Sequence, residues 1–130
     1  MSLLPDTTLS TIFAVLVYFV FSANVGRARK TYGIVAPAVT GDIEFEKRYR
    51  VQMNTVEQLV VFLPVLWLCA VWVGDGFAAT AGLLWSIGRI LYARGYYAAA
   101  EKRGPGFGLS ALATIVMLLA TLYAVVKSLV

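Results

Sequence analysis

The stretch FEKRYRVQMNTVEQLVVFLPVLWLCAVWV, residues 45–73, decides the fold because its character changes partway along. Its beginning is charged, with EKRYR at 46–50, whereas the run from Asn54 to Val73 contains a single formal charge, Glu57. An apolar run of this length matches the roughly 20 residues that a helix needs to cross a bilayer. The charged part therefore marks a membrane boundary, and the apolar part marks a span.

The composition of the whole chain is also that of a membrane protein. Of 130 residues, 60% are hydrophobic and 14% are charged, and the mean hydropathy is +0.79. A soluble domain of this size cannot bury so much apolar surface. We therefore predict one all-α membrane domain, residues 1–130, folded as an antiparallel bundle of four transmembrane helices. The expected spans are about 7–25, 54–73, 77–97 and 107–126.

The connections between these spans set the topology. Gly74-Asp75-Gly76 is a short turn that forces spans two and three into a hairpin. Between spans three and four, Pro105 and its neighbouring glycines are expected to end one helix before the next begins. The longer connection, residues 26–49, is polar, and its end is expected to extend span two as a helix beyond the membrane.

The basic residues are distributed unequally between the two sides. Nine lie in the first and third connections, against Lys127 alone on the other side. The positive-inside rule places both connections in the cytosol and both termini opposite, and we expect a multi-pass protein of a bacterial inner membrane. A topology signal of this kind explains the net charge of +4 better than nucleic-acid binding does. The amino-terminal residues lack the basic region of a signal peptide, so the first span is expected to be retained.

The residue types exclude several kinds of chemistry. The chain has no histidine, which removes imidazole bases, Ser-His nucleophiles and His-rich metal sites, and we expect no metal. The sole cysteine, Cys69, lacks an intramolecular disulfide partner and is expected to be a small buried hydrophobic residue.

Two charged residues inside the expected spans, Glu57 and Arg89, need an explanation, whereas Arg94, near the end of the third span, is counted with the connection that follows it. Glu57 is the only carboxylate and Arg89 the only clearly internal arginine, although such residues cost about 2.5–3.5 kcal/mol at the centre of a span. One explanation is a structural ion pair between spans two and three. The other is a functional site, because the hairpin places Glu57 at the depth of Tyr92 and Asn54 at the depth of Tyr96.

Helical spacing groups these polar residues into one expected pocket at the cytosolic edge. An aromatic belt is the alternative for the tyrosines, and we favour it for Tyr97. Arginines suit the carboxylates of a small anionic ligand, Glu57 suits its ammonium group, and the adjoining apolar surface suits a lipophilic second substrate. The residues expected in the pocket are Arg50, Asn54, Glu57, Arg89, Tyr92, Tyr96 and Arg103.

Two motifs resemble a known family. The pattern R-x-x-x-N-x-x-E at Arg50, Asn54 and Glu57, and RILYARGYYAAAEKR at residues 89–103, are similar to the membrane-associated proteins in eicosanoid and glutathione metabolism (MAPEG). The branch most similar is that of the microsomal glutathione transferases and leukotriene C4 synthase, over about residues 27–119. The resemblance implies a homotrimer of four-helix protomers that holds glutathione between adjacent subunits.

The resemblance also implies roles for particular residues. The activity implied is conjugation of glutathione to lipophilic electrophiles, with or without peroxidase activity on lipid hydroperoxides, in contact with membrane lipid. Arg103 corresponds to the catalytic arginine that stabilises the glutathione thiolate. The residues implied in glutathione binding are Arg29, Lys30, Arg50, Gln52, Asn54, Glu57, Tyr92 and Tyr96.

Three departures and two rival functions bear on this expectation. Gln58 stands where the leukotriene synthase has tyrosine, Gly104 stands where prostaglandin E synthase has serine, and the histidine of some members is absent. A non-catalytic lipid-binding scaffold of the same family is one alternative. A small four-helix multidrug exporter that uses Glu57 for proton exchange is the more remote one.

Overall fold

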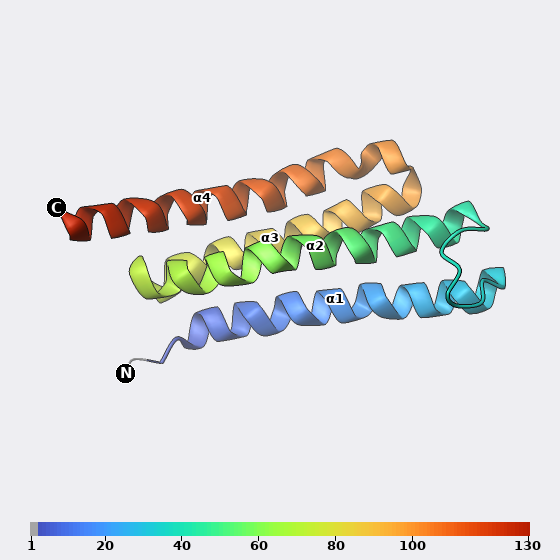
Figure 1. The fold of residues 1–130 in the computed structure, drawn as a ribbon, viewed down its shortest axis with the longest axis horizontal. Helices are drawn as coiled ribbons and strands as arrows, with labels where there is room; N and C mark the ends of the chain where they lie inside the picture. Colours follow the sequence, from blue (N-terminus) through green and yellow to red (C-terminus); the bar gives the residue numbers. More distant parts are fainter. Residues whose placement is uncertain (1–2) are drawn as a thin grey trace.

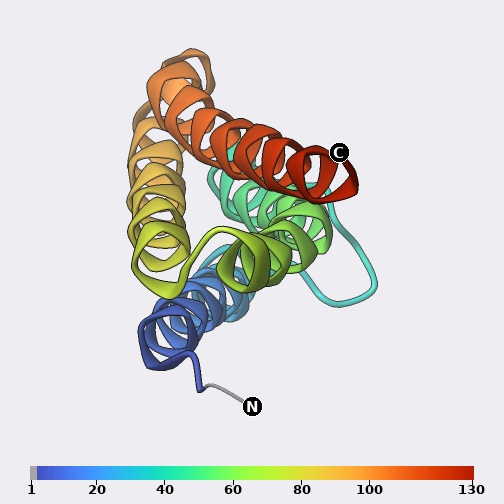
Figure 2. The ribbon, with the colours of Figure 1, turned by 90° about the vertical axis from the view of Figure 1, so that its left-hand side faces the viewer.

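The computed structural model describes residues 3–130 as an antiparallel bundle (Figure 1). Each of α2 and α3 packs on all the other long helices, whereas α1 and α4 lie on opposite sides of this central pair (Figure 2). The elements in chain order are α1 (Pro5–Tyr32), α2 (Ile43–Trp72), α3 (Asp75–Ala98), the short 3-10 helix η1 (Ala100–Arg103) and α4 (Gly104–Leu129).

The all-helical prediction is confirmed, and the helices are longer than the expected spans. The charged residues 43–53 form the first turns of α2, as expected. Three helical segments are long and apolar enough to cross a membrane: α1, α2 and Ala100–Leu129. The third expected span does not meet this criterion. Its helix, α3, carries buried polar residues such as Ser86 and Arg89, which its neighbours cover.

Local sequence signals explain where the helices begin and end, although one predicted helix end was wrong. Gly33 ends α1 with φ 68°, the left-handed conformation that glycine adopts without strain, and its N–H bonds to the Arg29 carbonyl. Asp42 caps α2 by accepting a hydrogen bond from the Glu44 N–H at 2.8 Å. Contrary to expectation, Pro105 does not separate the last two helices. It lies in the first turn of α4, where its missing N–H costs nothing, and the break falls at the extended Ala99.

The core brings α3 close to α2 and α4. The rings of Phe62 on α2 and Trp85 on α3 are stacked with centroids 4.0 Å apart, and both side chains are fully buried. On the other side of α3, the Ser110 hydroxyl donates to the Trp85 carbonyl at 3.1 Å. Gly106 lies directly against the backbone of Tyr92. This close backbone contact fixes the position of Tyr92, which matters for the site below.

At the opposite end of the bundle, Asp75 joins α3 to the start of α1. Its carboxylate accepts hydrogen bonds from the backbone N–H groups of Asp6 at 3.1 Å and Thr7 at 2.8 Å. These are amino-terminal N–H groups of α1 that have no partner within the helix. A carboxylate at a helix amino terminus also interacts favourably with the helix dipole.

This contact predicts acid sensitivity. Burial acts to raise the pKa of Asp75, but the hydrogen bonds from Thr7 and Asp6 outweigh it and lower that pKa. The contact therefore stabilises the fold above the ordinary aspartate pKa, about 4, and is lost as the pH falls through the lowered value. We expect Asp75→Asn to lower the thermal midpoint at pH 7 and to reduce its fall between pH 5 and pH 3. Parallel curves for the two proteins would contradict this.

Candidate functional site

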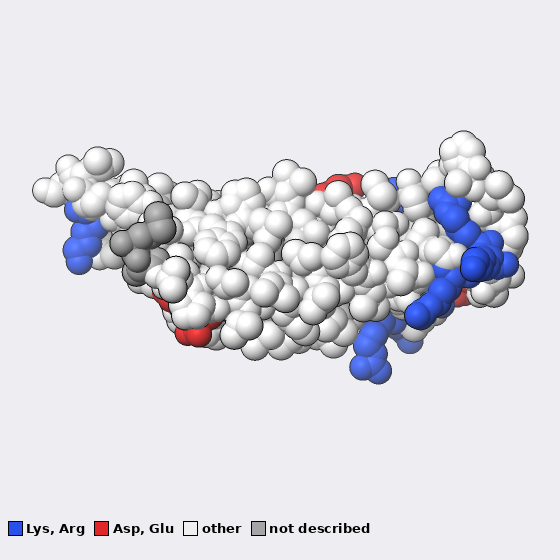
Figure 3. Space-filling model, turned by 90° about the horizontal axis from the view of Figure 1, so that it is seen from below, with Lys and Arg blue, Asp and Glu red and all other residues white. Residues whose placement is uncertain are grey.

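Basic side chains gather at one end of the bundle (Figure 3). At this end α1 finishes, α2 begins and α3 passes through η1 into α4, and we call it the basic end. Lys127 lies in the last turn of α4, at the other end. The lysines and arginines of the basic end are Arg27, Arg29, Lys30, Lys47, Arg48, Arg50, Arg94, Lys102 and Arg103.

The site is organised around Arg89 of α3, whose side chain is fully buried. Its Nη2 donates to Asn54 Oδ1 at 2.8 Å and to Thr55 Oγ1 at 2.9 Å, both on α2. Its guanidinium lies 4.1 Å from the centre of the Tyr92 ring. Nε and Nη1 have no partner within residues 3–130. The suggested ion pair with Glu57 is not formed, since Glu57 is exposed and the hydrogen bonds of the guanidinium within residues 3–130 go to Asn54 and Thr55.

A row of side chains connects Arg89 to the surface. The rings of Tyr92 and Tyr96, one helical turn apart, have centroids separated by 5.6 Å. The Arg103 guanidinium lies 5.9 Å from the centre of the Tyr96 ring. Arg103 Nη1 donates to the carbonyl of Ala100 at 2.7 Å, which anchors an otherwise exposed side chain. A positive charge is thus held at the outer end of the row.

On α2, three of the expected residues share one face. Arg50 and Glu57 flank Asn54 by about one helical turn on either side, and both are exposed. Because Arg89 donates to Asn54 Oδ1, the Asn54 amide NH₂ remains available to a ligand. We call Arg50, Asn54, Glu57, Tyr92, Tyr96 and Arg103 the first group. Contacts through Arg89 and the two tyrosine rings link Asn54, Tyr92, Tyr96 and Arg103, whereas Arg50 and Glu57 are placed beside them only by their positions on α2.

The other three expected residues do not join this group. Gln52 faces α1, donating to the Tyr18 hydroxyl at 3.4 Å and the Ser22 hydroxyl at 3.3 Å. Arg29 donates to the carbonyl of Ala38 at 2.8 Å and so holds the connection between α1 and α2. We call Arg29, Lys30 and Gln52 the second group. Gln52 lies two residues from Asn54 and therefore on nearly the opposite side of α2.

One residue that organises the site was missed in the sequence, and so was the role of another. Arg89 was expected in the pocket, but its function of holding the Asn54 amide was not foreseen. Thr55 was not singled out, although it is fully buried and accepts from Arg89. The available signal was the single internal arginine, which needs uncharged acceptors on a neighbouring helix when no carboxylate is buried beside it.

Comparison with known proteins gives consistent matches. The MAPEG family model matches residues 7–123. An uncharacterized protein of Synechocystis sp. is 49% identical over 90% of this chain and 85% of its own length. Microsomal glutathione S-transferase 2 of Mus musculus is 45% identical over 78% of this chain and 70% of its own. Leukotriene C4 synthase of Bos taurus is 37% identical, over 72% of this chain and 62% of its own.

Proposed function

The chain belongs to the MAPEG family, and from that premise we propose that it is a membrane-bound glutathione transferase acting on lipophilic electrophiles. Three apolar helices and the family identify an integral membrane protein. We propose that α3 crosses the membrane as well, because it runs beside the other three. We also propose that the basic end faces the cytosol of a bacterial inner membrane.

The row from Arg89 to Arg103 is the observation that carries this proposal. Glutathione has two carboxylates, one ammonium group and a thiol. Exposed Arg50 suits a carboxylate, exposed Glu57 suits the ammonium group, and the Asn54 amide can donate to a peptide carbonyl. Tyr96 and Arg103 then remain for the sulfur. The similarity to microsomal glutathione S-transferase 2 and leukotriene C4 synthase supports the same ligand.

The chemistry requires a thiolate, because the thiol itself is a weak nucleophile. An ordinary thiol has a pKa of about 8.5, and lowering it by about two units takes ~2.7 kcal/mol. One hydrogen bond to a charged group contributes about 1.5–3 kcal/mol, so the Arg103 guanidinium suffices to lower the pKa of the thiol by this amount.

The bound thiolate can react in two ways. With an electrophilic carbon, the thiolate forms a carbon–sulfur bond as the leaving group departs with its electron pair. With a hydroperoxide the thiolate takes the outer oxygen as the O–O bond breaks, and the departing alkoxide is protonated to the alcohol. The thiol of a second glutathione then attacks the sulfur of the resulting sulfenic acid, which forms the disulfide and releases water.

The two groups of residues support a site shared between copies of the chain. One glutathione cannot reach the first group and Gln52 together within one chain, because these residues occupy opposite sides of α2. We propose a homotrimer in which the first group of one subunit and the second group of its neighbour hold the same glutathione. Native mass spectrometry in detergent should give the mass of three chains. A single chain that binds glutathione with undiminished affinity would contradict the shared site, while leaving the transferase proposal intact.

The transferase proposal is tested with purified protein, glutathione and 1-chloro-2,4-dinitrobenzene, whose conjugate absorbs light. We expect conjugate to form faster than in protein-free buffer and to form at a rate that saturates with glutathione. Failure to bind glutathione in calorimetry, together with no conjugation, would instead favour a non-catalytic lipid-binding scaffold. Proton-coupled efflux of lipophilic cations from vesicles would favour the exporter.

Arg89→Met is expected to weaken glutathione binding without lowering the stability of the fold. Methionine removes the buried charge itself and leaves no ion unpaired, and Thr55 keeps its hydrogen bond to the Val51 carbonyl. We therefore expect little change in the thermal midpoint. The Asn54 amide loses the hydrogen bond that orients it, and one such bond contributes about 1 kcal/mol. We therefore expect the Kd for glutathione, measured by calorimetry, to rise about fivefold. An unchanged Kd would show that Arg89 has no positioning role.

A further inference from the structure

Two cavities follow one another along the groove between α1 and α3. The first, of about 400 Å³, is entirely apolar and is lined by Phe13, Leu16, Val17, Val20, Phe21 and Ile90. The second, of about 390 Å³, lies at the basic end, and its lining includes Asn24, Arg27, Thr31, Tyr32, Arg48 and Tyr97. Along α1 the apolar cavity ends at Phe21, and the polar cavity begins one helical turn later, at Asn24.

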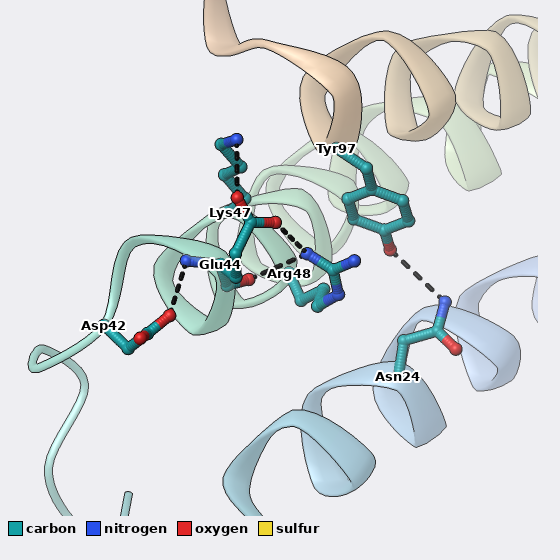
Figure 4. Close-up of polar contacts among 6 residues, drawn as sticks. All are labelled: Asn24, Asp42, Glu44, Lys47, Arg48 and Tyr97. Atoms are coloured by element: carbon teal, nitrogen blue, oxygen red, sulfur yellow. Dashed lines mark hydrogen bonds and ion pairs between the residues drawn. The ribbon is translucent and has the colours of Figure 1, made fainter. Parts of the chain in front are cut away.

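The polar cavity carries an excess of positive charge. Arg48 lies 4.7 Å from the centre of the Tyr97 ring, and Asn24 donates to the Tyr97 hydroxyl at 3.3 Å (Figure 4). The nearby carboxylate, Glu44, is shared between Lys47 and Arg48, at 3.0 Å from each. It accepts from only one nitrogen of Arg48, Nη1, so this arginine keeps donors for a ligand.

Other features of the cavity also suit an anion. Arg27 is exposed and its guanidinium makes no hydrogen bond within residues 3–130. Because Asn24 donates to the Tyr97 oxygen, the proton of that hydroxyl is free to be donated to a ligand. Two guanidinium groups and one hydroxyl thus face a cavity with no carboxylate in its lining.

We propose that this groove binds one anionic membrane phospholipid on each chain. Its phosphate lies between Arg27 and Arg48 and accepts from Tyr97, and one acyl chain follows the apolar cavity towards Phe13. The fourteen helical steps from Phe13 to Arg27 span about 21 Å. That length accommodates a chain that reaches the middle of a hydrocarbon core ~30 Å thick.

This site is separate from the first group of residues proposed to bind glutathione. It lies on the same side of α1 as Lys30 and on the same side of α2 as Gln52, both members of the second group. Ile90 and Tyr97 are seven residues apart and so lie on one side of α3, facing α1. Tyr96 faces Arg103 instead. The proposal therefore requires a membrane protein but does not depend on the transferase activity. Phospholipid binding and glutathione binding can be measured independently.

The test is native mass spectrometry of the full chain in detergent, with phosphatidylglycerol or zwitterionic phosphatidylcholine added. We expect one phosphatidylglycerol retained per chain and much less phosphatidylcholine. Loss of a charge-assisted phosphate contact should weaken retention about tenfold or more, both in Arg27→Gln and in Arg27→Gln/Arg48→Gln. The first variant removes no side-chain hydrogen bond within residues 3–130. Val20→Trp, which fills the apolar cavity from a position 56% exposed, should have the same effect.

The matched control is Arg94→Gln/Lys102→Gln, which removes two exposed charges from the same end but outside the cavity. It should retain phosphatidylglycerol as the unmodified chain does. Equal retention of both lipids, or equal loss in the control, would overturn a specific site. Displacement of the lipid by millimolar inorganic phosphate would indicate a free-phosphate site instead. A change in the number of chains in Arg27→Gln, with no loss of lipid, would assign the groove to a second copy.

Discussion

Replacing Arg103 by alanine is expected to lower the rate of glutathione conjugation about 25-fold at pH 7. If Arg103 lowers the pKa of bound glutathione from about 8.5 to about 6.5, the thiolate population at this pH is about three quarters with the arginine and ~3% without it. Arg103 is exposed, and among the described residues its side chain donates a hydrogen bond only to the carbonyl of Ala100. The substitution should therefore leave the fold intact.

The pH dependence distinguishes this role from simple ligand binding. The conjugation rate at saturating glutathione should rise through about pH 6.5 in the unmodified protein and through about pH 8.5 in Arg103→Ala. Lys102→Ala is the matched control, because Lys102 is the adjacent exposed cation and makes no side-chain contact in the row. A full rate in folded Arg103→Ala, or an equal loss in Lys102→Ala, would contradict the assignment.

Replacing Gly106 by alanine is expected to destabilise the bundle by about 3 kcal/mol or more. A Cβ at this position would overlap the Tyr92 backbone nitrogen and lie 2.5 Å from Tyr92 Cα and 2.7 Å from the Gly88 carbonyl oxygen. These are backbone atoms of α3, so the two helices have to separate. Overpacking of this kind costs about 1–3 kcal/mol when side chains can adjust, and more when they cannot.

Gly108→Ala is the matched control for this prediction. Gly108 lies two residues further along α4, and a Cβ there would meet nothing within 4 Å. Alanine is favoured over glycine in a helix by about 1 kcal/mol, so this variant should be slightly more stable than the unmodified chain. Thermal unfolding in one detergent compares both. A Gly106→Ala midpoint equal to that of the unmodified chain would show that the helices are not in close contact at Tyr92.

The four helices, and the shared face of Arg50, Asn54 and Glu57 on α2, were predictable because they depend on local periodicity. The length of the apolar run from Asn54 to Val73 predicts a membrane-spanning helix, and the backbone preferences of Gly74-Asp75-Gly76 predict the turn that follows it. Both properties can be recognised in the sequence alone. The spacing of Arg50, Asn54 and Glu57 likewise places them on one face whatever surrounds the helix.

The remaining features depend on which helix covers which. The sequence places Arg89 inside an apolar span. Its hydrogen-bond acceptors, Asn54 and Thr55, depend on the exact packing of α2 on α3 and could not be predicted. The position of Gln52 against α1 is likewise a tertiary contact. The predicted position of the break between α3 and α4 was wrong because proline is favoured in the first turn of a helix as well as in a loop. Only the extended backbone of Ala99 shows that Pro105 begins a helix here.

The most direct test of the transferase account is the ultraviolet absorbance of glutathione thiolate bound to the detergent-purified protein at pH 7. We predict that a thiolate band appears on addition of glutathione, saturates at no more than one per chain, and is absent in Arg103→Ala while Lys102→Ala retains it. Binding of glutathione without a thiolate band in the unmodified protein would contradict the account. Arg103 would then not stabilise the anion on which the proposed chemistry depends.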